Sequence, residues 1–465
     1  MVSFKPFRNI LVNFLNLVAA SLVFVSIQSS HAITPRSGHD SVLLNNKLYV
    51  FGGKVGETSS AIDLAENSNE LLILDTKIPF STSSPAWTIN TVGPRVAYHT
   101  LSIGGPQNEL LVLYGGDYAD RDDNPLFYYN TSDPYPEWIK ANLSLGLQRI
   151  QHTAVTRLSD SMNYFFGGIP DILNPDDPAI VQLQDLFNLD TRKNIWNILS
   201  LDPKTPSGRY QHTATIFSDG KMYLTGGVTK NDKNLTDEML ADMNQIYVYD
   251  TMNARWDVQV AIGNMPLPRR EHAAAGTRDG RLIIHGGVSR DYNTFYDDIA
   301  VLDISKLPYT WTVVEAKGTK PKARYSHTAT MVGTNMLVLF GVTGYATVNG
   351  LGRAVADNYT YILDTRTFTW KDQYNPENLE FTDTAPSSNT HSNVGLPNNA
   401  ISTNMMHKAP IALIVGLTLG SILFLSLIGG GLFWFYRKRK QDYSHKVYNT
   451  GTFNKEQMSN QVILT

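Results

Sequence analysis

The stretch that decides the fold lies between residues 209 and 258, in the middle of the chain. It contains four short runs of β-type residues, RYQHTATIF (209–217), KMYLTGG (221–227), QIYVYD (245–250) and RWDV (255–258). Asp219-Gly220 is a hairpin signal between the first two runs, and residues 251–254 turn the chain between the last two. No helical period runs through the stretch. It therefore predicts four antiparallel strands, the content of one β-propeller blade.

The same unit recurs six times, and each copy carries an Arg, a His, a Gly-Gly pair and a Trp. The histidines are His39, His99, His152, His212, His272 and His327. The glycine pairs are Gly52-Gly53, Gly115-Gly116, Gly167-Gly168, Gly226-Gly227 and Gly286-Gly287, with a degenerate Gly341-Val342 in the sixth unit. The tryptophans are Trp87, Trp138, Trp196, Trp256, Trp311 and Trp370. A fixed period of this size indicates a solenoid, a propeller or an array, and the four-strand content favours the propeller.

The unit resembles the kelch repeat, whose marks are Gly-Gly after the second strand and a spaced aromatic and Trp further on. Arg209-Tyr-Gln-His212, Gly226-Gly227, Tyr249-Asp250 and Trp256 match these marks. The resemblance covers residues 33–373 and implies an all-β, six-bladed kelch-type β-propeller. The departures from the pattern are Val342 in place of a second glycine, Tyr129-Asn130 in place of an apolar-Asp pair, and one extra residue between Arg95 and His99. The repeats fill nearly complete frames, so the sequence leaves open how the ring closes.

The first 32 residues have the pattern of a secretory signal. Lys5 and Arg8 precede an apolar stretch from Ile10 to Ile27, and Ser30-His31-Ala32 supplies small residues at the −3 and −1 positions of a cleavage site. The alternative interpretation is an uncleaved anchor helix. We expect a cleaved signal at residues 1–32.

A second apolar segment runs from Ile411 to Tyr436 without a charged residue, and Arg437-Lys438-Arg439-Lys440 follows at once. At about 1.5 Å per residue, such a helix spans the roughly 30 Å hydrocarbon core of a membrane. The basic cluster favours the cytoplasmic side. We therefore expect a single-pass type I protein of the plasma membrane or a secretory-pathway membrane, with the propeller outside or in the lumen. Gly416 and Gly420 either support a homodimer through this helix or simply face lipid.

The predicted organisation has five parts. They are a signal at 1–32, the propeller ectodomain at 33–373, a Ser/Thr/Asn-rich stalk at 374–410, the transmembrane helix at 411–436 and a cytoplasmic tail at 437–465. The chain has no Cys, so disulfides do not stabilise the ectodomain. Four N-glycosylation sequons fit passage through the secretory pathway, at Asn130, Asn142, Asn234 and Asn358. The formal net charge of −3 does not favour nucleic-acid binding.

The repeated polar residues have structural and functional interpretations. Six histidines at equivalent places around a ring are too far apart to share a metal ion, so we expect each to tie its strand to a neighbouring loop, with no metal bound. The repeated Arg is expected to bond carbonyls and acids between blades. The alternative is a basic patch that faces the central channel and binds an anionic group. These arginines are Arg36, Arg95, Arg149, Arg209, Arg270 and Arg324.

The long loops after Gly-Gly differ most between repeats. By blade connectivity they share a face with the Arg-His entries, and loops on a rigid scaffold often carry binding residues. We predict a ligand-binding face made of the six arginines together with Asp237, Glu238 and Asp242. The alternative is that these acidic loops only keep the protein soluble. The predicted function is a cell-surface or endomembrane recognition scaffold for an extracellular or lumenal protein or glycan.

The alternative function is a membrane-tethered carbohydrate-active enzyme, similar to propeller oxidases or epimerases. The copper centre of galactose oxidase needs a Tyr cross-linked to a Cys, and this chain contains no Cys. Neither a Gly-x-Ser-x-Gly elbow nor a His-Glu-x-x-His helix is present. We therefore predict no catalytic residue and no cofactor. His285, the one unrepeated His of the propeller, is singled out for mutation.

Overall fold

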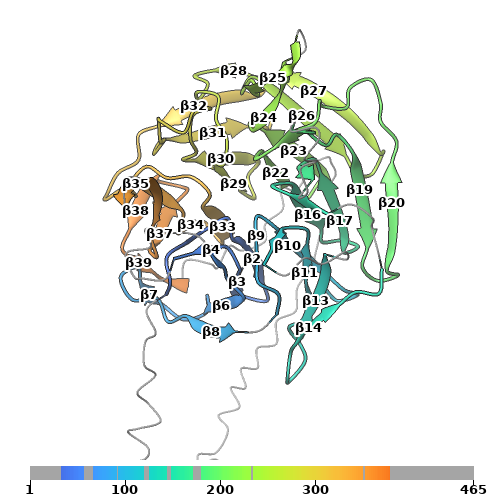
Figure 1. Ribbon diagram of the computed structural model, residues 1–465. Helices are drawn as coiled ribbons and strands as arrows, with labels where there is room; N and C mark the ends of the chain where they lie inside the picture. The colour runs from blue at the N-terminus through green and yellow to red at the C-terminus, as the bar shows by residue number, and fades with distance from the viewer. Residues whose placement is uncertain are drawn as a thin grey trace, which may run out of the picture. The chain divides into compact units, whose positions relative to one another are not determined.

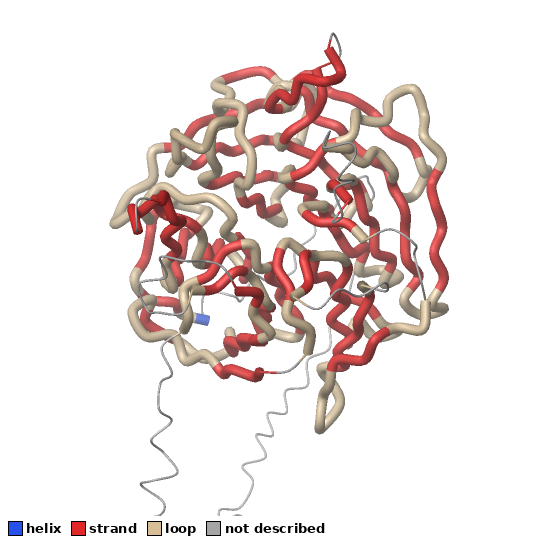
Figure 2. The backbone as a smooth tube through the Cα atoms, viewed as in Figure 1, coloured by secondary structure: helices blue, strands red, loops and turns tan. Residues whose placement is uncertain are grey.

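The computed structural model describes residues 33–56, 66–91, 93–119, 125–143, 148–170, 180–231, 234–348 and 351–376. Within these ranges the chain forms β-strands and connecting loops, and the short blue piece in Figure 2 is a 3₁₀ turn and not an α-helix, so the predicted all-β fold is confirmed there. None of the described segments is a helix long and apolar enough to cross a membrane. The predicted signal, transmembrane helix and tail, and the stalk beyond residue 376, lie outside the described residues.

Six antiparallel sheets, each with four core strands, form the blades. The innermost strands are β2 (Asp40–Leu44), β10 (Thr100–Gly104), β16 (Thr153–Arg157), β22 (Thr213–Ile216), β29 (Ala273–Gly276) and β33 (Thr328–Val332). The second strands are β3 (Lys47–Phe51), β11 (Leu110–Tyr114), β17 (Met162–Phe166), β23 (Lys221–Thr225), β30 (Arg281–His285) and β34 (Asn335–Leu339). The third are β6 (Glu70–Asp75), β13 (Leu126–Asn130), β19 (Leu186–Asp190), β26 (Gln245–Asp250), β31 (Ile299–Asp303) and β37 (Thr360–Asp364). The outermost are β8 (Thr88–Thr91), β14 (Trp138–Lys140), β20 (Ile195–Leu199), β27 (Arg255–Val260), β32 (Thr310–Val314) and β38 (Thr369–Lys371).

The blades surround a common axis (Figure 1). Each innermost strand contacts the innermost strands of both neighbouring blades, and β2 of the first blade contacts β33 of the sixth. The six sheets therefore form a closed ring, which is the arrangement of a β-propeller. The predicted count of six repeats is confirmed among the described residues.

The first glycine of each pair lies where the next blade approaches most closely. Gly226 has φ +63°, and an added Cβ would lie 2.6 Å from His272 Cε1 and 2.9 Å from the Arg269 carbonyl oxygen. A side chain at this position would collide with the neighbouring blade, and positive φ disfavours residues other than glycine. The Gly-Gly signature therefore reports the packing between consecutive blades.

The sixth blade corrects the sequence alignment by one residue. Gly341 donates its N–H to the Arg36 carbonyl at 2.9 Å, as Gly53 does to the Val96 carbonyl at 2.9 Å. Gly341 is therefore the second glycine of its pair, and the predicted pair Gly341-Val342 was wrong. Phe340 occupies the first position with φ +57°. Its ring packs against His39 and Trp87 of the first blade.

The repeated tryptophans lie in the gaps between blades. The ring centroid of Trp138 lies 4.6 Å from that of Phe51, and the centroid of Trp256 lies 5.4 Å from that of Phe166. In both cases the partner is the last residue of the second strand in the preceding blade. Such aromatic contacts bury large apolar areas at the blade interfaces.

The four core strands of the first blade all come from the N-terminal part of the domain, so no blade combines core strands from both ends. Strand β39 (Gln373–Tyr374), which follows the sixth blade, pairs antiparallel with β7 (Phe80–Ser81) of the first blade. The Tyr374 side chain is buried, its ring stacks on Phe80 with centroids 4.8 Å apart, and its hydroxyl donates to the Thr76 carbonyl at 2.8 Å. The segment after the last blade thus completes the outer part of the first blade.

Small sheets lie at one end of the blades. In each, the segment that enters the innermost strand pairs with the segment that follows Gly-Gly. They are formed by β1 (Arg36–Ser37) with β4 (Lys54–Val55) and β5 (Glu66–Asn67), β9 (Val96–Ala97) with β12 (Asp117–Tyr118), β15 (Arg149–Ile150) with β18 (Ile169–Pro170), and β21 (Arg209–Tyr210) with β24 (Val228–Asn231) and β25 (Asn234–Leu240). In the sixth blade β35 (Val342–Val348) pairs with β36 (Leu351–Ala356), and Tyr325 bridges to Val342. The prediction that entries and loops share a face is confirmed, and we call it the loop face.

One further short strand, β28 (Ile262–Gly263), precedes the fifth blade. It pairs in parallel with β32 and adds a fifth strand to the outer edge of that sheet. The linker between two blades therefore covers the outer strand of the blade that follows it.

Candidate site at the loop-face mouth of the channel

A channel follows the propeller axis and is lined by the innermost strands. Its part nearer the loop face is a cavity of about 230 Å³, and the next part has a volume of about 340 Å³. Asp40, Ser41, Ala154 and Ala214 line both parts, so the two cavities are continuous. The loop-face cavity is the candidate functional site.

The mouth of this cavity is a ring of six residues, one from each blade, directly before the repeated His. Each has a positive φ between 52° and 62°. Each backbone N–H donates to the carbonyl of the equivalent residue in the preceding blade at 2.7–3.1 Å, and Gly38 closes the ring by donating to Ser326. We call these residues the rim: Gly38, Tyr98, Gln151, Gln211, Glu271 and Ser326. The backbone of the rim is thus fixed by a closed circle of hydrogen bonds, and its side chains distinguish the blades.

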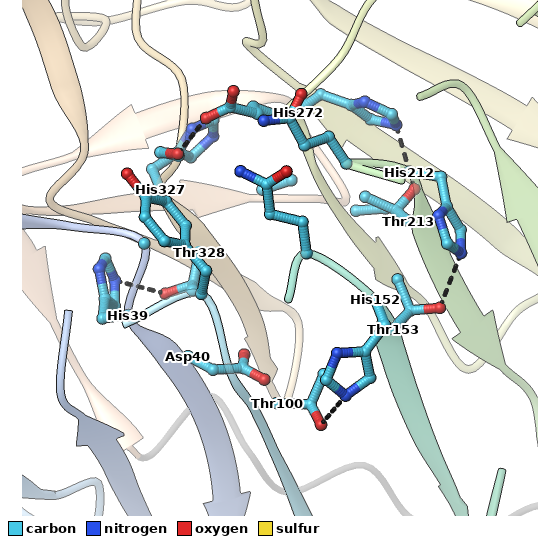
Figure 3. A pocket seen from close by; sticks show the side chains of 18 of the residues that line it. His39, Asp40, Thr100, His152, Thr153, His212, Thr213, His272, His327 and Thr328 are labelled. Carbon is cyan, nitrogen blue, oxygen red and sulfur yellow. Dashed lines mark hydrogen bonds between the residues drawn. The ribbon is translucent and has the colours of Figure 1, made fainter. Parts of the chain in front are cut away.

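Beneath the rim the repeated histidines join consecutive blades (Figure 3). The Nε2 atoms of His39, His152, His212 and His272 are hydrogen-bonded to Thr328, Thr100, Thr153 and Thr213, at 3.1, 3.0, 2.9 and 3.0 Å. In each pair the Thr follows the His of the preceding blade. The structural role predicted for these histidines is confirmed, but the partner is the innermost strand of the preceding blade and not a loop.

His285 replaces a missing threonine in this pattern. The fifth blade has Ala273 after its His, which leaves no hydroxyl for His327. His285 Nδ1 is instead hydrogen-bonded to His327 Nε2 at 3.0 Å. Burial lowers the pKa of His285 to about 3 and that of His327 well below its usual range, so both imidazoles are neutral. The unrepeated histidine that the sequence singled out therefore supports the blade interface.

The joint between the first and second blades is the exception. Here the residue after the first His is Asp40, and its carboxylate accepts from the N–H of Ser41 and of Leu101, each at 2.7 Å. His99 is 5% exposed, and neither of its ring nitrogens has a hydrogen-bond partner among the described residues. Burial lowers the pKa of His99 to about 3 and raises the pKa of Asp40 to about 7. This joint places a carboxyl and an unpaired imidazole at the cavity wall.

Four of the predicted arginines are buried inside their blades and do not form a basic patch in the channel. Arg149 pairs with both oxygens of Asp185 at 2.9 and 2.7 Å, and Arg324 pairs with those of Asp357 at 3.0 and 2.8 Å. Arg36 pairs with Glu70 and donates to the Gly52 carbonyl at 3.0 Å. The Arg209 guanidinium lies 4.9 Å from the ring centroid of Tyr247. These arginines link the entry segment to the second and third strands of the same blade.

The other two predicted arginines do not occupy the equivalent position. In the fifth blade it is Arg269, fully buried, that pairs with Asp298 at 2.6 and 2.9 Å and donates to Gly286. In the second blade Val96 occupies the position, and Arg95 is exposed one residue earlier. The interpretation of Arg95 and Arg270 as members of the repeated set was wrong. Arg269, three residues before His272, has the spacing of Arg209 and His212 and could have been found on that signal.

Arg270 instead belongs to a polar network at the mouth. Its guanidinium lies between the rings of Tyr210 and Tyr292, 5.3 and 4.6 Å from their centroids, and it donates to the side chain of Gln211. Stacking between two aromatic faces favours the cation. Arg270 is therefore held in place by groups of the protein itself.

Glu271 lies at the centre of this network. The Tyr292 hydroxyl donates to its carboxylate at 2.6 Å, the Ser326 hydroxyl also donates to it, and its side chain is 8% exposed. Burial, and next the nearby carboxylate of Glu271, raise the pKa of Tyr98. The rim thus combines one held carboxylate with neutral amide and hydroxyl groups.

The predicted acidic loop reaches this network through one of its three residues. Glu238, on β25, accepts from the Tyr210 hydroxyl at 3.1 and 3.2 Å and from Gln182 at 3.1 Å. Asp242 is exposed and accepts from the Asn244 N–H at 3.0 Å. Asp237 is also on β25, but its side chain lies outside the described part. The structure therefore connects Glu238, through Tyr210 and Arg270, to the rim.

The sequons lie in different surroundings. Asn142 is exposed, and Asn130 ends β13 and accepts from the Ser132 N–H at 3.0 Å. Asn358 donates its side-chain nitrogen to the Ile33 carbonyl at 2.9 Å. Asn234 begins β25, and its side chain is not among the described ones. Glycosylation at the four positions stays a prediction.

Sequence reasoning missed Asp40, His99 as an unpaired group, and the rim residues. The residue after each His reads Asp, Thr, Thr, Thr, Ala and Thr in the six blades. The two departures from Thr mark the two unusual joints, so the signal was present. The rim residues are equivalent in sequence, because each directly precedes the repeated His, but only the closed backbone circle shows that they form the mouth of the channel.

Comparison with known families identifies the repeat. The model of the KLHDC2/KLHL20/DRC7 Kelch-repeats domain matches residues 14–227, 106–341 and 220–401, three overlapping stretches that together cover most of the chain.

Individual proteins are similar to this chain over different shares of its length. Kelch domain-containing protein 3 of Homo sapiens is 25% identical over 323 residues, which cover 68% of this chain and 80% of that protein. Tip elongation aberrant protein 1 of Schizosaccharomyces pombe is 30% identical over 212 residues, 44% of this chain and 17% of that protein. Adagio-like protein 3 of Oryza sativa subsp. japonica is 27% identical over 325 residues, 66% of this chain and 46% of that protein. The chain thus spans less than half of the last two relatives.

Proposed function

The chain belongs to the kelch-repeat family, and on that basis we propose that it is a recognition scaffold whose loop face binds a protein ligand. Kelch-domain proteins are in general protein-interaction scaffolds. A fold alone does not determine a function, so the proposal needs a site. The site is the mouth of the channel with the network that leads from Glu238 to the rim.

The observation that carries the proposal is the contrast between a fixed backbone and variable side chains at the rim. Six equivalent residues are locked by mutual backbone hydrogen bonds, yet their side chains are Gly, Tyr, Gln, Gln, Glu and Ser. A preorganised backbone that presents different side chains lowers the entropic cost of binding. The small sheets of the loop face surround this mouth and supply further contact area.

Site-specific photo-crosslinking tests the proposal. Met239 and Met252 are both exposed, at 40% and 69%, and both belong to the fourth blade. Met239 lies on β25 at the loop face, and Met252 lies in the turn after β26 at the opposite end. A photoreactive residue at Met239 should give a discrete protein adduct in cells, and the same residue at Met252 should not. Equal adducts from both positions, or none from Met239, contradict the proposal.

We further propose that the propeller is held outside the cell or in the lumen of the secretory pathway by the segment 411–436. The support is the uncharged apolar stretch, the basic cluster that follows it and the signal-like first 32 residues. A glycan in place of a protein ligand is the alternative ligand, and a homodimer through Gly416 and Gly420 is a further proposal. Loss of the Met239 adduct after glycosidase treatment of the cells would indicate the glycan.

A further inference from the structure

The loop-face cavity carries acidic groups and no free cation. Among the described residues that line it, the two acidic side chains are those of Asp40, whose pKa burial raises to about 7, and Glu271. The six repeated histidines are neutral, because burial lowers the pKa of each. Arg270, the residue before Glu271, lies 4.0 Å from the Glu271 carboxylate and is also engaged by Gln211 and two tyrosine rings. The cavity therefore favours a positively charged guest.

Asp40 and His99 both have free acceptor capacity at the cavity wall. Each carboxylate oxygen of Asp40 accepts one backbone N–H, which leaves a second lone pair on each oxygen. A neutral His99 has one acceptor nitrogen, and this nitrogen has no partner in the described part of the chain. At four other joints the corresponding imidazole is bonded to a threonine. A buried group without a partner costs free energy, so a guest that donates hydrogen bonds here gains more than at an ordinary surface.

The layer after Asp40 is apolar on most sides. Ala154, Ala214, Ala274 and Ala329 occupy equivalent places in four blades, two residues after the repeated His, and all four are only partly buried. A chain of methylene groups can lie against these methyl groups within the 230 Å³ cavity. The wall therefore fits a narrow aliphatic chain with a charged end.

We propose that the channel mouth receives the side chain of a lysine from a partner polypeptide, with its ammonium bound by Asp40 and His99 and its entry favoured by Glu271. An ammonium has three donors on a compact head, and the two carboxylate oxygens of Asp40 and the acceptor nitrogen of His99 offer three acceptors. One carboxylate and one imidazole are too few ligands for a typical protein-bound metal ion. The inference rests on the proposed function and specifies its ligand.

The test uses full-length protein in detergent micelles and three fluorescent peptides that differ at one position. The peptides are blocked at both ends and have a central lysine, N-acetyl-lysine or glutamate between glycines, and binding is followed by fluorescence polarisation up to millimolar concentration. We expect the lysine peptide to bind at least about tenfold more tightly than either other peptide, because only it carries the ammonium. Equal binding of acetyl-lysine, preference for glutamate, or no binding of the lysine peptide overturns the proposal.

The variant Asp40→Thr tests the role of Asp40 in a protein that is expected to fold normally. It introduces the residue that four other blades have at this position, and His99 then has a hydroxyl partner like the other histidines. The lysine preference should disappear in Asp40→Thr while the melting temperature does not fall. The matched control is Asp257→Asn. Asp257 lies on β27, the outermost strand of the fourth blade, so this variant should keep the lysine preference. An Asp40→Thr protein that still prefers lysine overturns the assignment of Asp40.

The peptide-binding experiment and the photo-crosslinking experiment can fail independently. If the photo-crosslinked adduct at Met239 forms but lysine and acetyl-lysine peptides bind alike, the loop face binds a partner without a lysine in the channel. If the adduct itself does not form, the recognition function fails and the peptide preference is then a property of the channel alone.

Discussion

Asp40 and Ala273 are the two residues that replace the threonine to which a repeated histidine of the following blade is otherwise hydrogen-bonded. Thr occupies the equivalent position in the other four blades and pairs with the His of the following blade. At Ala273 the lost hydroxyl is replaced by His285, so Nε2 of His327 keeps a hydrogen-bond partner. At Asp40 no replacement is present among the described residues, and both ring nitrogens of His99 are buried without a partner. Departures from a repeat are therefore the most informative residues of this chain.

The stability of the protein should depend on pH through Asp40. Burial raises its pKa from 3.8 to about 7, so the folded state binds this proton more tightly than the unfolded state does. The contribution of Asp40 to the free energy of unfolding is fully present below about pH 4 and is lost as the pH rises to about 7. Each unit of difference between the folded and unfolded pKa corresponds to about 1.4 kcal/mol. Relative to Asp40→Asn, the wild-type free energy of unfolding should fall by more than about 1.4 kcal/mol between pH 4 and pH 7. Urea unfolding of both proteins across this range measures it, and a constant difference contradicts the burial of Asp40.

The role of His285 predicts a rescue experiment. His285→Ala should destabilise the fold by about 2–4 kcal/mol, because it leaves His327 without a partner and opens a cavity. Adding Ala273→Thr supplies the hydroxyl that other blades use, and it should recover about 1 kcal/mol in the His285→Ala background. In the wild-type background Ala273→Thr should give no gain, since His327 is already bonded. A double-mutant cycle by chemical unfolding measures this coupling, and additive effects would count against the pairing.

At the scale of the element, a buried arginine holds the entry segment of a blade to its second and third strands. The arginines form bidentate pairs with Asp185, Asp298 and Asp357. They also donate to the carbonyl of the residue at the first position of each Gly-Gly pair, which is Gly167, Gly286 and, in the sixth blade, Phe340. Breaking a buried ion pair from one side leaves an uncompensated charge, which is more costly than removing an exposed pair. This link orients the loop-face segments relative to the blade.

Arg269 and Arg270 are adjacent and allow a sharp comparison of these roles. Arg269→Ala should cost about 3–5 kcal/mol of stability, because Asp298 then stays partly buried without a counter-charge. Arg270→Ala should cost about 1–2 kcal/mol, since it removes a stacked cation at the mouth and not the link inside the blade. Thermal and urea unfolding of both variants measure the difference. Equal losses would mean that the assignment of Arg269 to the repeated position is wrong.

The elements were predictable where the repeat is strict. The four-strand content, the count of six and the inter-blade tryptophans follow from residues whose roles are the same in every blade. The sixth glycine pair was misread because Phe340 adopts a positive φ that sequence patterns reserve for glycine, and the closing joint tolerates its side chain. The channel network was not predictable, because it joins Glu238, Tyr210, Arg270 and Glu271 from different segments through side-chain geometry.

At the scale of the whole molecule, ring closure depends on the segment after the last blade. Tyr374→Ala should destabilise the full chain by about 3–5 kcal/mol, because it removes a buried aromatic ring and the bond to Thr76. Hydrogen exchange in the variant should rise first in β7 and β8. Tyr359→Ala is the control, since Tyr359 is 57% exposed, and it should change stability by less than about 0.5 kcal/mol. Unchanged stability in Tyr374→Ala contradicts this mode of closure.

The proposed membrane anchor makes a prediction about the whole chain. Removal of residues 411–465 should release the propeller into the medium of expressing cells, because the signal remains and the apolar segment is gone. Retention in the cell of a folded, soluble truncated protein contradicts the proposed topology. Fractionation and immunoblotting with an antibody against the propeller measure the outcome.

The most direct test of the recognition scaffold is co-purification of a partner from crosslinked cells with loop-face and opposite-face variants of the tagged full-length protein. The loop-face variant replaces Asp237, Glu238 and Asp242 by Asn, Gln and Asn, and the control replaces Asp219, at the opposite end of the fourth blade, by Asn. We predict a stoichiometric partner with the wild type and the control, and its loss with the loop-face variant. Recovery of the same partner with all three proteins, or of the bare protein in every case, would contradict binding through the loop face.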